Sequence, residues 1–200
     1  MKKTTKKVLA LVSSAVLLVS ASVLGTMAYL TSQDVVTNTF SVGKVTITLD
    51  EADVKTDGTK EDTTDRVKSN EYHLMPGHDY IKDPTVHVAA NSENSWIFIK
   101  VENGIANIED GSNPIATQIS NKGWTALDGV NGVYYKEYTK SETQTDLIVF
   151  EKFVVNETVN GTTLETYKDA QIKVTAYAIQ KDGIDSVSAA WSALNPTTTE

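Results

Sequence analysis

The sequence predicts an all-β protein: a single jelly-roll-like antiparallel β-sandwich preceded by a cleaved helical signal peptide. Three observations lead to this prediction. The N-terminus is basic and then apolar, the rest of the chain holds many short segments of alternating apolar and polar residues, and Gly, Pro and Asn separate these segments. Short strands divided by such turn residues are typical of two-layer β proteins.

The first 28 residues have the organisation of a secretory signal peptide. Four lysines (Lys2, Lys3, Lys6 and Lys7) precede the uncharged run Val8–Leu24, and small residues follow at Thr26 and Ala28. We expect cleavage between Ala28 and Tyr29. The alternative is a retained membrane anchor, but a run of this length spans roughly 25 Å as a helix, short for a bilayer core of about 30 Å.

Cleavage would make the protein more acidic. The chain has 18 basic and 26 acidic residues; four of the basic ones lie in the leader, so the mature chain keeps 14 and has a net charge of −12. Such a charge argues against nucleic acid and anionic membrane as partners. We therefore expect contact with the membrane only through the uncleaved leader. The chain has no Cys, so its core must hold it together without disulfides.

The mature chain begins with a polar arm, residues 29–39, followed by a β-sandwich domain, residues 40–195, and a tail, residues 196–200. From Phe40 to Leu49 apolar residues alternate with polar ones, which predicts a strand with a bend at Gly43. Asp50–Asn70 is charged and rich in Thr, and we expect an exposed acidic loop.

Further strands are expected along the domain. Tyr80–Val88 contains Pro84, which favours an edge strand or a bulge, and Trp96–Val101 is apolar on both faces, as in a central strand. The remaining candidates are Trp124–Leu127, Val133–Tyr138, Leu147–Val155 and Gln171–Gln180, with a turn over Asp128–Gly132. Ile115–Ile119 and Ser186–Leu194 each fit a short helix or a strand.

Several segments together resemble one protein family. They are GTMAYLTS at the leader end, NTFSVGKVTITL, the LMPG turn, WIFIKV and the late strand KVTAYAIQ, in this order. The chain is similar to the TasA/camelysin family of Gram-positive exported proteins, whose leaders are cut by a SipW-type signal peptidase. The resemblance implies a jelly-roll subunit that polymerises into biofilm matrix fibres, with the N-terminal arm as a donor strand for the next subunit.

The resemblance and the sequence together lead to a specific expectation. The protein is expected to be a secreted, non-enzymatic structural protein of the cell surface or biofilm matrix, whose partners are copies of itself and other matrix or surface components. The donor-strand candidates are Tyr29, Leu30, Val35 and Val36. Donor-strand addition pairs an extended segment with an open sheet edge and places alternate side chains in the core. The tail lacks a sorting motif or a hydrophobic segment, so we expect release or non-covalent retention.

Two other functions remain as alternatives. One is a secreted metallopeptidase of the camelysin type, but the zinc signature HExxH does not occur and the histidines His73, His78 and His87 are scattered. The acidic residues of Asp50–Asp65 lack the ligand spacing of a calcium loop. We therefore expect no metal, cofactor or catalytic residue. The other alternative is a monomeric surface-binding or adhesion module that uses exposed aromatics. The three Trp (Trp96, Trp124 and Trp191) and the pair Tyr134–Tyr135 could form a carbohydrate platform, but large aromatics in a β-sandwich more often fill the core, and we expect this of Trp96.

Overall fold

The computed structural model describes residues 44–195. Ten strands and three helices lie in this part of the chain. The strands are β1 (Ile47–Ala52), β2 (Arg66–Val67), β3 (Asp79–Ile81), β4 (Thr85–Val88), β5 (Ser95–Asn103), β6 (Thr125–Ala126), β7 (Val133–Tyr138), β8 (Thr145–Ile148), β9 (Lys152–Val154) and β10 (Ile172–Gln180). The helices are α2 (Ile115–Asn121), α3 (Gly161–Glu165) and α4 (Val187–Leu194).

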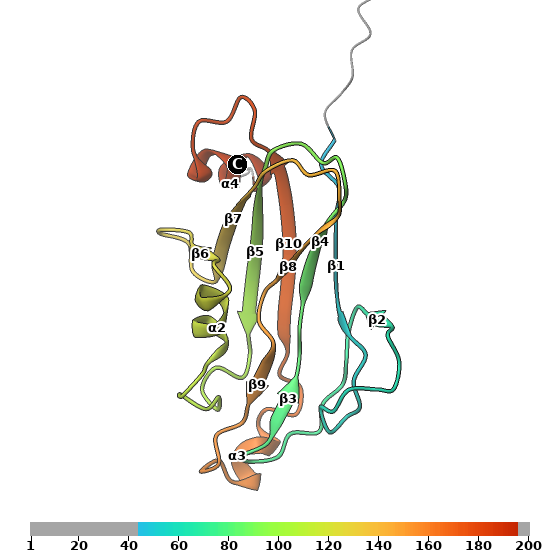
Figure 1. Cartoon of the computed structure of the whole chain (residues 1–200). Helices are drawn as coiled ribbons and strands as arrows, with labels where there is room; N and C mark the ends of the chain where they lie inside the picture. Colours follow the sequence, from blue (N-terminus) through green and yellow to red (C-terminus); the bar gives the residue numbers. More distant parts are fainter. Residues whose placement is uncertain (1–43, 196–200) are drawn as a thin grey trace, which may run out of the picture. The chain divides into compact units, whose positions relative to one another are not determined.

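Most strands belong to two four-stranded sheets (Figure 1). The first sheet has the order β2-β1-β4-β8 and the second has the order β10-β5-β7-β6, while β3 and β9 form a separate two-stranded ribbon. Every pairing is antiparallel. The predictions of an all-β fold and of antiparallel pairing are confirmed for the described residues.

The main hydrophobic core joins the inward faces of the two sheets. Val86 and Val88 of β4 and Ile97 and Ile99 of β5 have no exposed surface. Leu49 of β1 and Val174 of β10 are only partly buried, although both pack against this core. The core is therefore closed in its middle and incompletely covered where β1 and β10 face each other.

A second, smaller core lies on the outer face of the second sheet, beneath α4. Phe98 points away from the main core, is fully buried, and packs against Trp191 of α4 with ring centroids 5.3 Å apart. The Ser186 side chain caps α4 by accepting a hydrogen bond from the Ala189 amide at 3.2 Å. Ile97 and Phe98 thus lie on opposite covered faces of β5, which confirms the prediction of a central strand.

Two expected long strands are each divided in the structure. Tyr80–Val88 forms β3 and β4 with a break around Pro84, and Leu147–Val155 forms β8 and β9. The halves stay side by side, since the Val149 amide donates to the Pro84 carbonyl at 2.9 Å. Proline has no amide hydrogen and cannot continue a regular ladder, which accounts for the break.

The segment Asp50–Asn70 was expected as an exposed acidic loop, but parts of it are buried or paired with other strands. Its first residues complete β1, Glu51 and Ala52 are about 5 % exposed, and Val54 pairs with Lys60 as an isolated bridge. Arg66–Val67 returns as β2 to pair with Glu51–Ala52. The apolar positions are too few to reveal these pairings, because most of their contacts are made by the backbone.

The remaining expectations fall in three groups. The two ambiguous segments contain the helices α2 and α4. The turn over Asp128–Gly132 is present, with Gly129 and Gly132 at φ values of 72° and 71°, a conformation that favours glycine. The signal peptide, the arm, the strand start at Phe40 and the tail lie outside the described residues.

Candidate functional site

The outer edge of β10 has no neighbouring strand within residues 44–195. Gly104 donates to the Gln171 carbonyl at 2.8 Å, and Lys181 donates to the Asn94 carbonyl at 2.8 Å, so the odd-numbered residues of β10 hydrogen-bond to β5. Because backbone groups alternate in direction along an antiparallel strand, the even-numbered ones turn theirs outward. These are Ile172, Val174, Ala176, Ala178 and Gln180.

The edge of β1 lies across from β10 and is free over a shorter length. Ala89 donates to the Thr46 carbonyl at 2.9 Å, so Ile47 and Leu49 direct their backbone groups away from β4. At the far end, β2 pairs with Glu51 and Ala52, and the Lys68 ammonium donates to the Leu49 carbonyl. The longer accessible edge therefore belongs to β10.

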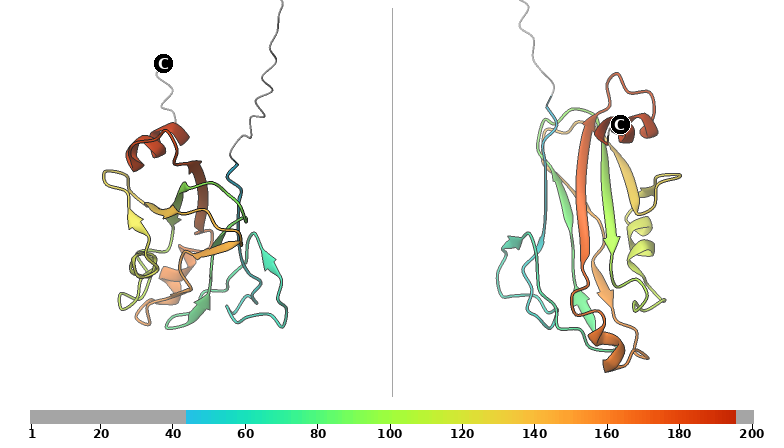
Figure 2. Two further views of the ribbon diagram at one scale, coloured as in Figure 1. Left: turned by 45° about the horizontal axis from the view of Figure 1, so that its top comes forward. Right: turned by 180° about the vertical axis from the view of Figure 1, so that it is seen from behind.

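The two sheets leave an opening between β1 and β10, and the view from behind in Figure 2 shows where these two strands run. A cavity of about 1100 Å³ occupies this opening, and a second of about 400 Å³ continues it between Ile47–Leu49 and Val174–Ala176. One wall is residues 68–74 with the end of β1, and the other is residues 164–174. We call the two cavities together the trough.

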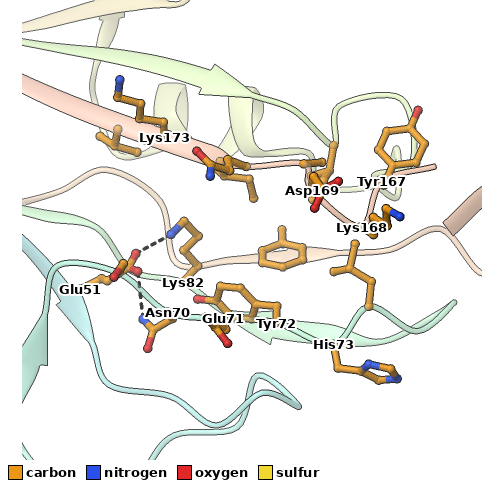
Figure 3. A pocket seen from close by; sticks show the side chains of 18 of the residues that line it. Glu51, Asn70, Glu71, Tyr72, His73, Lys82, Tyr167, Lys168, Asp169 and Lys173 are labelled. Atoms are coloured by element: carbon orange, nitrogen blue, oxygen red, sulfur yellow. Dashed lines mark hydrogen bonds and ion pairs between the residues drawn. The ribbon is translucent and has the colours of Figure 1, made fainter. Parts of the chain in front are cut away.

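The inner lining of the trough mixes apolar side chains with a charged pair (Figure 3). The Lys82 ammonium lies 2.6 Å from a Glu51 carboxylate oxygen, and the Asn70 amide donates to the other oxygen at 2.9 Å. The Lys82 and Glu51 side chains are 9 % and 6 % exposed. Burial of an ion pair to this extent makes each partner depend on the other, because either charge alone would be costly inside the protein.

Aromatic contacts hold one wall of the trough in place. Tyr72 packs edge-on against Tyr80 and Phe153, with centroid distances of 5.8 and 5.2 Å, and donates to the Ile81 carbonyl at 3.0 Å. Burial raises the pKa of Tyr72 above its ordinary value, with the charges of Glu51 and Asp83 adding to the effect. The phenol therefore stays protonated at neutral pH and keeps this donor.

A chain of charged side chains crosses the outer face of the first sheet. His87 contacts Asp50 through Nε2 at 2.8 Å and Asp146 through Nδ1 at 2.7 Å, and Arg66 pairs with Asp50 and Asp83. Burial alone lowers the pKa of His87, but the hydrogen bonds and charges of Asp146 and Asp50 outweigh it and raise the pKa. Both ring nitrogens face carboxylates, an arrangement that suits the doubly protonated imidazolium.

The structure places the three histidines in separate environments. His73 is exposed, the His78 Nε2 atom lies 2.7 Å from the Asp57 carbonyl oxygen, and His87 belongs to the charged chain above. Within residues 44–195, no three His, Cys, Asp or Glu side chains form a group that could hold a metal ion. The expected cleavage residues Ala28 and Tyr29, and the donor-strand candidates Leu30, Val35 and Val36, lie outside the described residues.

The aromatic residues considered for an adhesion surface are largely covered. Trp124 is 2 % exposed and donates through its indole to the Ile148 carbonyl at 2.8 Å. Trp96, Trp191 and Tyr135 are partly buried in the core beneath α4, and Tyr134 packs against the main core. Their packing contributes to the stability of the two cores.

The sequence analysis missed Glu51, Asn70 and Lys82 as site residues. A signal was present, because Glu51 continues the inward phase of Ile47 and Leu49, and Lys82 continues that of Tyr80. Two opposite charges at inward positions of two strands predict a buried pair.

The chain was compared with protein-family models, curated proteins and solved structures, and none of them matches it. In the described part of the chain, no helix is long and apolar enough to cross a membrane.

Proposed function

We propose that the mature chain is a secreted structural subunit of the cell surface or biofilm matrix, and that subunits assemble into fibres by donor-strand addition. In this proposal the arm of one subunit, residues 29–39, enters the trough of the next. Membership of the TasA/camelysin family, the jelly-roll topology and release by a SipW-type signal peptidase at Ala28–Tyr29 belong to the same proposal. So do the absence of enzymatic activity and the other matrix or surface components as partners.

The observation that carries the proposal is the free edge of β10 beside the trough. Five residues direct their backbone N–H and C=O groups outward there, and such groups readily template another strand. The inward side chains of β10, such as Val174 and Ala176, are only partly buried in the isolated subunit. An added strand would satisfy the backbone groups and cover these side chains at the same time.

The length of the arm agrees with the length of this edge. β10 has nine residues, which extend over about 30 Å at the usual rise of a strand. The arm of eleven residues spans at most about 40 Å when fully extended. It is long enough to follow the edge of β10 from end to end.

The geometry of assembly follows from the two surfaces involved. The arm and the trough are different parts of one subunit, so the contact is heterologous and repeats without closing unless the rotation returns to the start. A fibre is the expected product. The alternative is that the arm folds back at Gly43 into its own trough, which would give a monomer.

The test compares the mature chain from Tyr29 to Glu200 with the same chain lacking residues 29–39. Sedimentation and negative-stain microscopy across a range of salt concentrations measure assembly, since salt screens the repulsion between subunits of net charge −12. Fibres from the intact chain and monomers from the shortened one support the proposal. Fibres from both would place assembly on another surface, and monomers from both would overturn the structural role.

A further inference from the structure

The Lys82 ammonium has unused hydrogen-bonding capacity at the trough. An ammonium group carries three N–H donors, and among residues 44–195 the one hydrogen-bond acceptor for the Lys82 ammonium is the Glu51 carboxylate, at 2.6 Å. The ammonium also lies 5.8 Å from the centroid of the Tyr72 ring. Lys82 lines the trough, as does Glu51, and Figure 3 shows the two side chains meeting within this lining.

We infer that the trough selects an incoming strand that places an uncharged oxygen-bearing side chain (Ser, Thr, Asn or Gln) over Lys82, and that this contact sets the register of the strand. The inference rests on the proposed function. An open trough lets solvent hydrogen-bond to the ammonium, but an inserted strand excludes that solvent. A buried donor left without an acceptor is unfavourable, so a strand that supplies an oxygen is preferred over one that supplies a methyl group.

The charge of the surroundings favours a neutral oxygen over a carboxylate. The Glu51 carboxylate already lies against Lys82 and balances its charge. The rest of the lining carries both signs, with Lys68, Lys168 and Lys173 beside Glu71, Glu165 and Asp169. A second carboxylate beside Glu51 would meet a like charge at close range in a poorly solvated space. An amide or hydroxyl oxygen accepts the hydrogen bond without this repulsion.

The arm carries uncharged oxygens on both faces of an extended strand. One face holds Ser32 and Asn38, with Asp34 between them, and the other holds Thr31, Gln33, Thr37 and Thr39. The polar character of the arm, unexpected for a strand that enters an apolar core, thus fits a trough whose lining is itself partly polar. One of the two faces meets Lys82, and the experiment identifies which.

The test measures fibre assembly of the mature chain in a double-mutant cycle. One arm variant removes the uncharged oxygens of the first face (Ser32→Ala with Asn38→Leu), and a second removes those of the other (Thr31→Val, Gln33→Met, Thr37→Val and Thr39→Val). Each is combined with the native trough and with a trough in which Glu51→Met and Lys82→Met replace the ion pair by apolar side chains. The critical concentration for assembly, from sedimentation, reports the affinity of arm for trough.

With the native trough, one arm variant should raise the critical concentration about tenfold or more, the range expected when a buried donor loses its acceptor. The same arm variant should assemble as well as the native arm, or better, with the apolar trough. Equal effects of both arm variants in both troughs would overturn this inference and leave the proposed function standing. Failure of the unmodified mature chain to assemble would overturn both.

Discussion

Lys82 and Glu51 form an ion pair, 2.6 Å between nitrogen and oxygen, in the lining of the trough between β1 and β10. Glu51 ends the inward face of β1, and Lys82 follows β3 just before the break at Pro84. Asn70, which follows β2, links this part of the chain to the pair, because its amide donates both to Glu51 and to the Ala52 carbonyl, each at 2.9 Å. The strand break and the buried pair thus build one wall of the trough together.

Removing one partner of this pair should destabilise the protein more than removing both. Lys82→Met leaves the Glu51 carboxylate buried without its counter-charge, a change that typically costs about 3–5 kcal/mol. Glu51→Met combined with Lys82→Met leaves no charge and should lie within about 2 kcal/mol of the native free energy of unfolding. Guanidinium denaturation of the three proteins measures the difference.

A matched control is available on the surface. Lys152 pairs with Asp79 at 2.5 Å, but the two side chains are 44 % and 58 % exposed. Lys152→Met should therefore change the free energy of unfolding by less than about 1 kcal/mol. If Lys82→Met is as mild as this control, the pair is not buried in solution and the lining of the trough has been misassigned.

The central strand should be the most sensitive part of the core. Phe98 is fully buried between β5 and α4, so Phe98→Ala should lower the free energy of unfolding by about 3–5 kcal/mol. That is a large share of a typical total of roughly 5–15 kcal/mol. Ile148→Ala serves as the comparison, because Ile148 is 38 % exposed and should lose much less. Equal melting temperatures for native protein and Phe98→Ala would contradict the burial seen here.

The central strand also shows what the sequence can predict. Trp96–Val101 has too many apolar residues to leave one face in water, so its central position follows from composition alone. The division of Tyr80–Val88 into two strands depends on which strand lies beside Pro84. Only the tertiary structure determines that neighbour. Likewise β2 is short and polar, and its pairing with Glu51 and Ala52 is made by backbone groups that leave no pattern in the sequence.

The sequence indicated an open sheet edge but not which strand forms it. An incomplete core with an open edge followed from the idea of strand addition, but β10 alternates as regularly as an interior strand would. Its position at the edge is decided by which strands pair with β5, and β7 takes the other side of β5. Such long-range pairings are set by the whole core rather than by local residues.

His87 should make stability depend on pH. Its folded-state pKa is raised above the ordinary value near 6.5, so its stabilising contribution is fully present below about pH 6.5 and is lost as the pH rises through the raised value. For Asp50, burial opposes the shift, but the hydrogen bonds and charges of Arg66 and His87 lower the pKa. The contribution of Asp50 is therefore lost only in acid. The ion pairs of His87 and Asp50 should therefore contribute most to the free energy of unfolding between these two pH limits.

The measurement is the free energy of unfolding of native protein and His87→Gln from pH 5 to pH 9. The advantage of the native protein should be greatest at the acid end of this range and should shrink toward pH 9. His73→Gln is the control, since His73 is an exposed histidine that makes no contact with Asp50 or Asp146. A difference for His87→Gln that grows with pH would reverse the sign and reject the assignment of His87 as an imidazolium.

Processing of the leader gives a prediction that does not depend on the trough. Secreted protein should begin at Tyr29, and Ala28→Lys should block its release, because the peptidase requires a small residue just before the cleaved bond. Intact mass of the secreted material determines the first residue. Efficient processing of Ala28→Lys, or a mature N-terminus elsewhere, would move the arm and require the donor-strand candidates to be reassigned.

The edge of β10 can be blocked without disturbing the sheet. The Ala176 amide points outward, so Ala176→Pro removes a donor that only an incoming strand would use, and proline is tolerated at such edge positions. Assembly of the mature chain should be lost while its melting temperature falls by only a few degrees. Thr175→Pro, one residue earlier, instead removes an amide that hydrogen-bonds to β5 opposite Lys100 and should unfold the protein at a markedly lower temperature. Sedimentation and thermal denaturation of both variants separate the two effects. Fibres from a folded Ala176→Pro variant would show that the added strand does not pair with β10, and the short free edge of β1 at Ile47–Leu49 would then be the remaining template beside the trough.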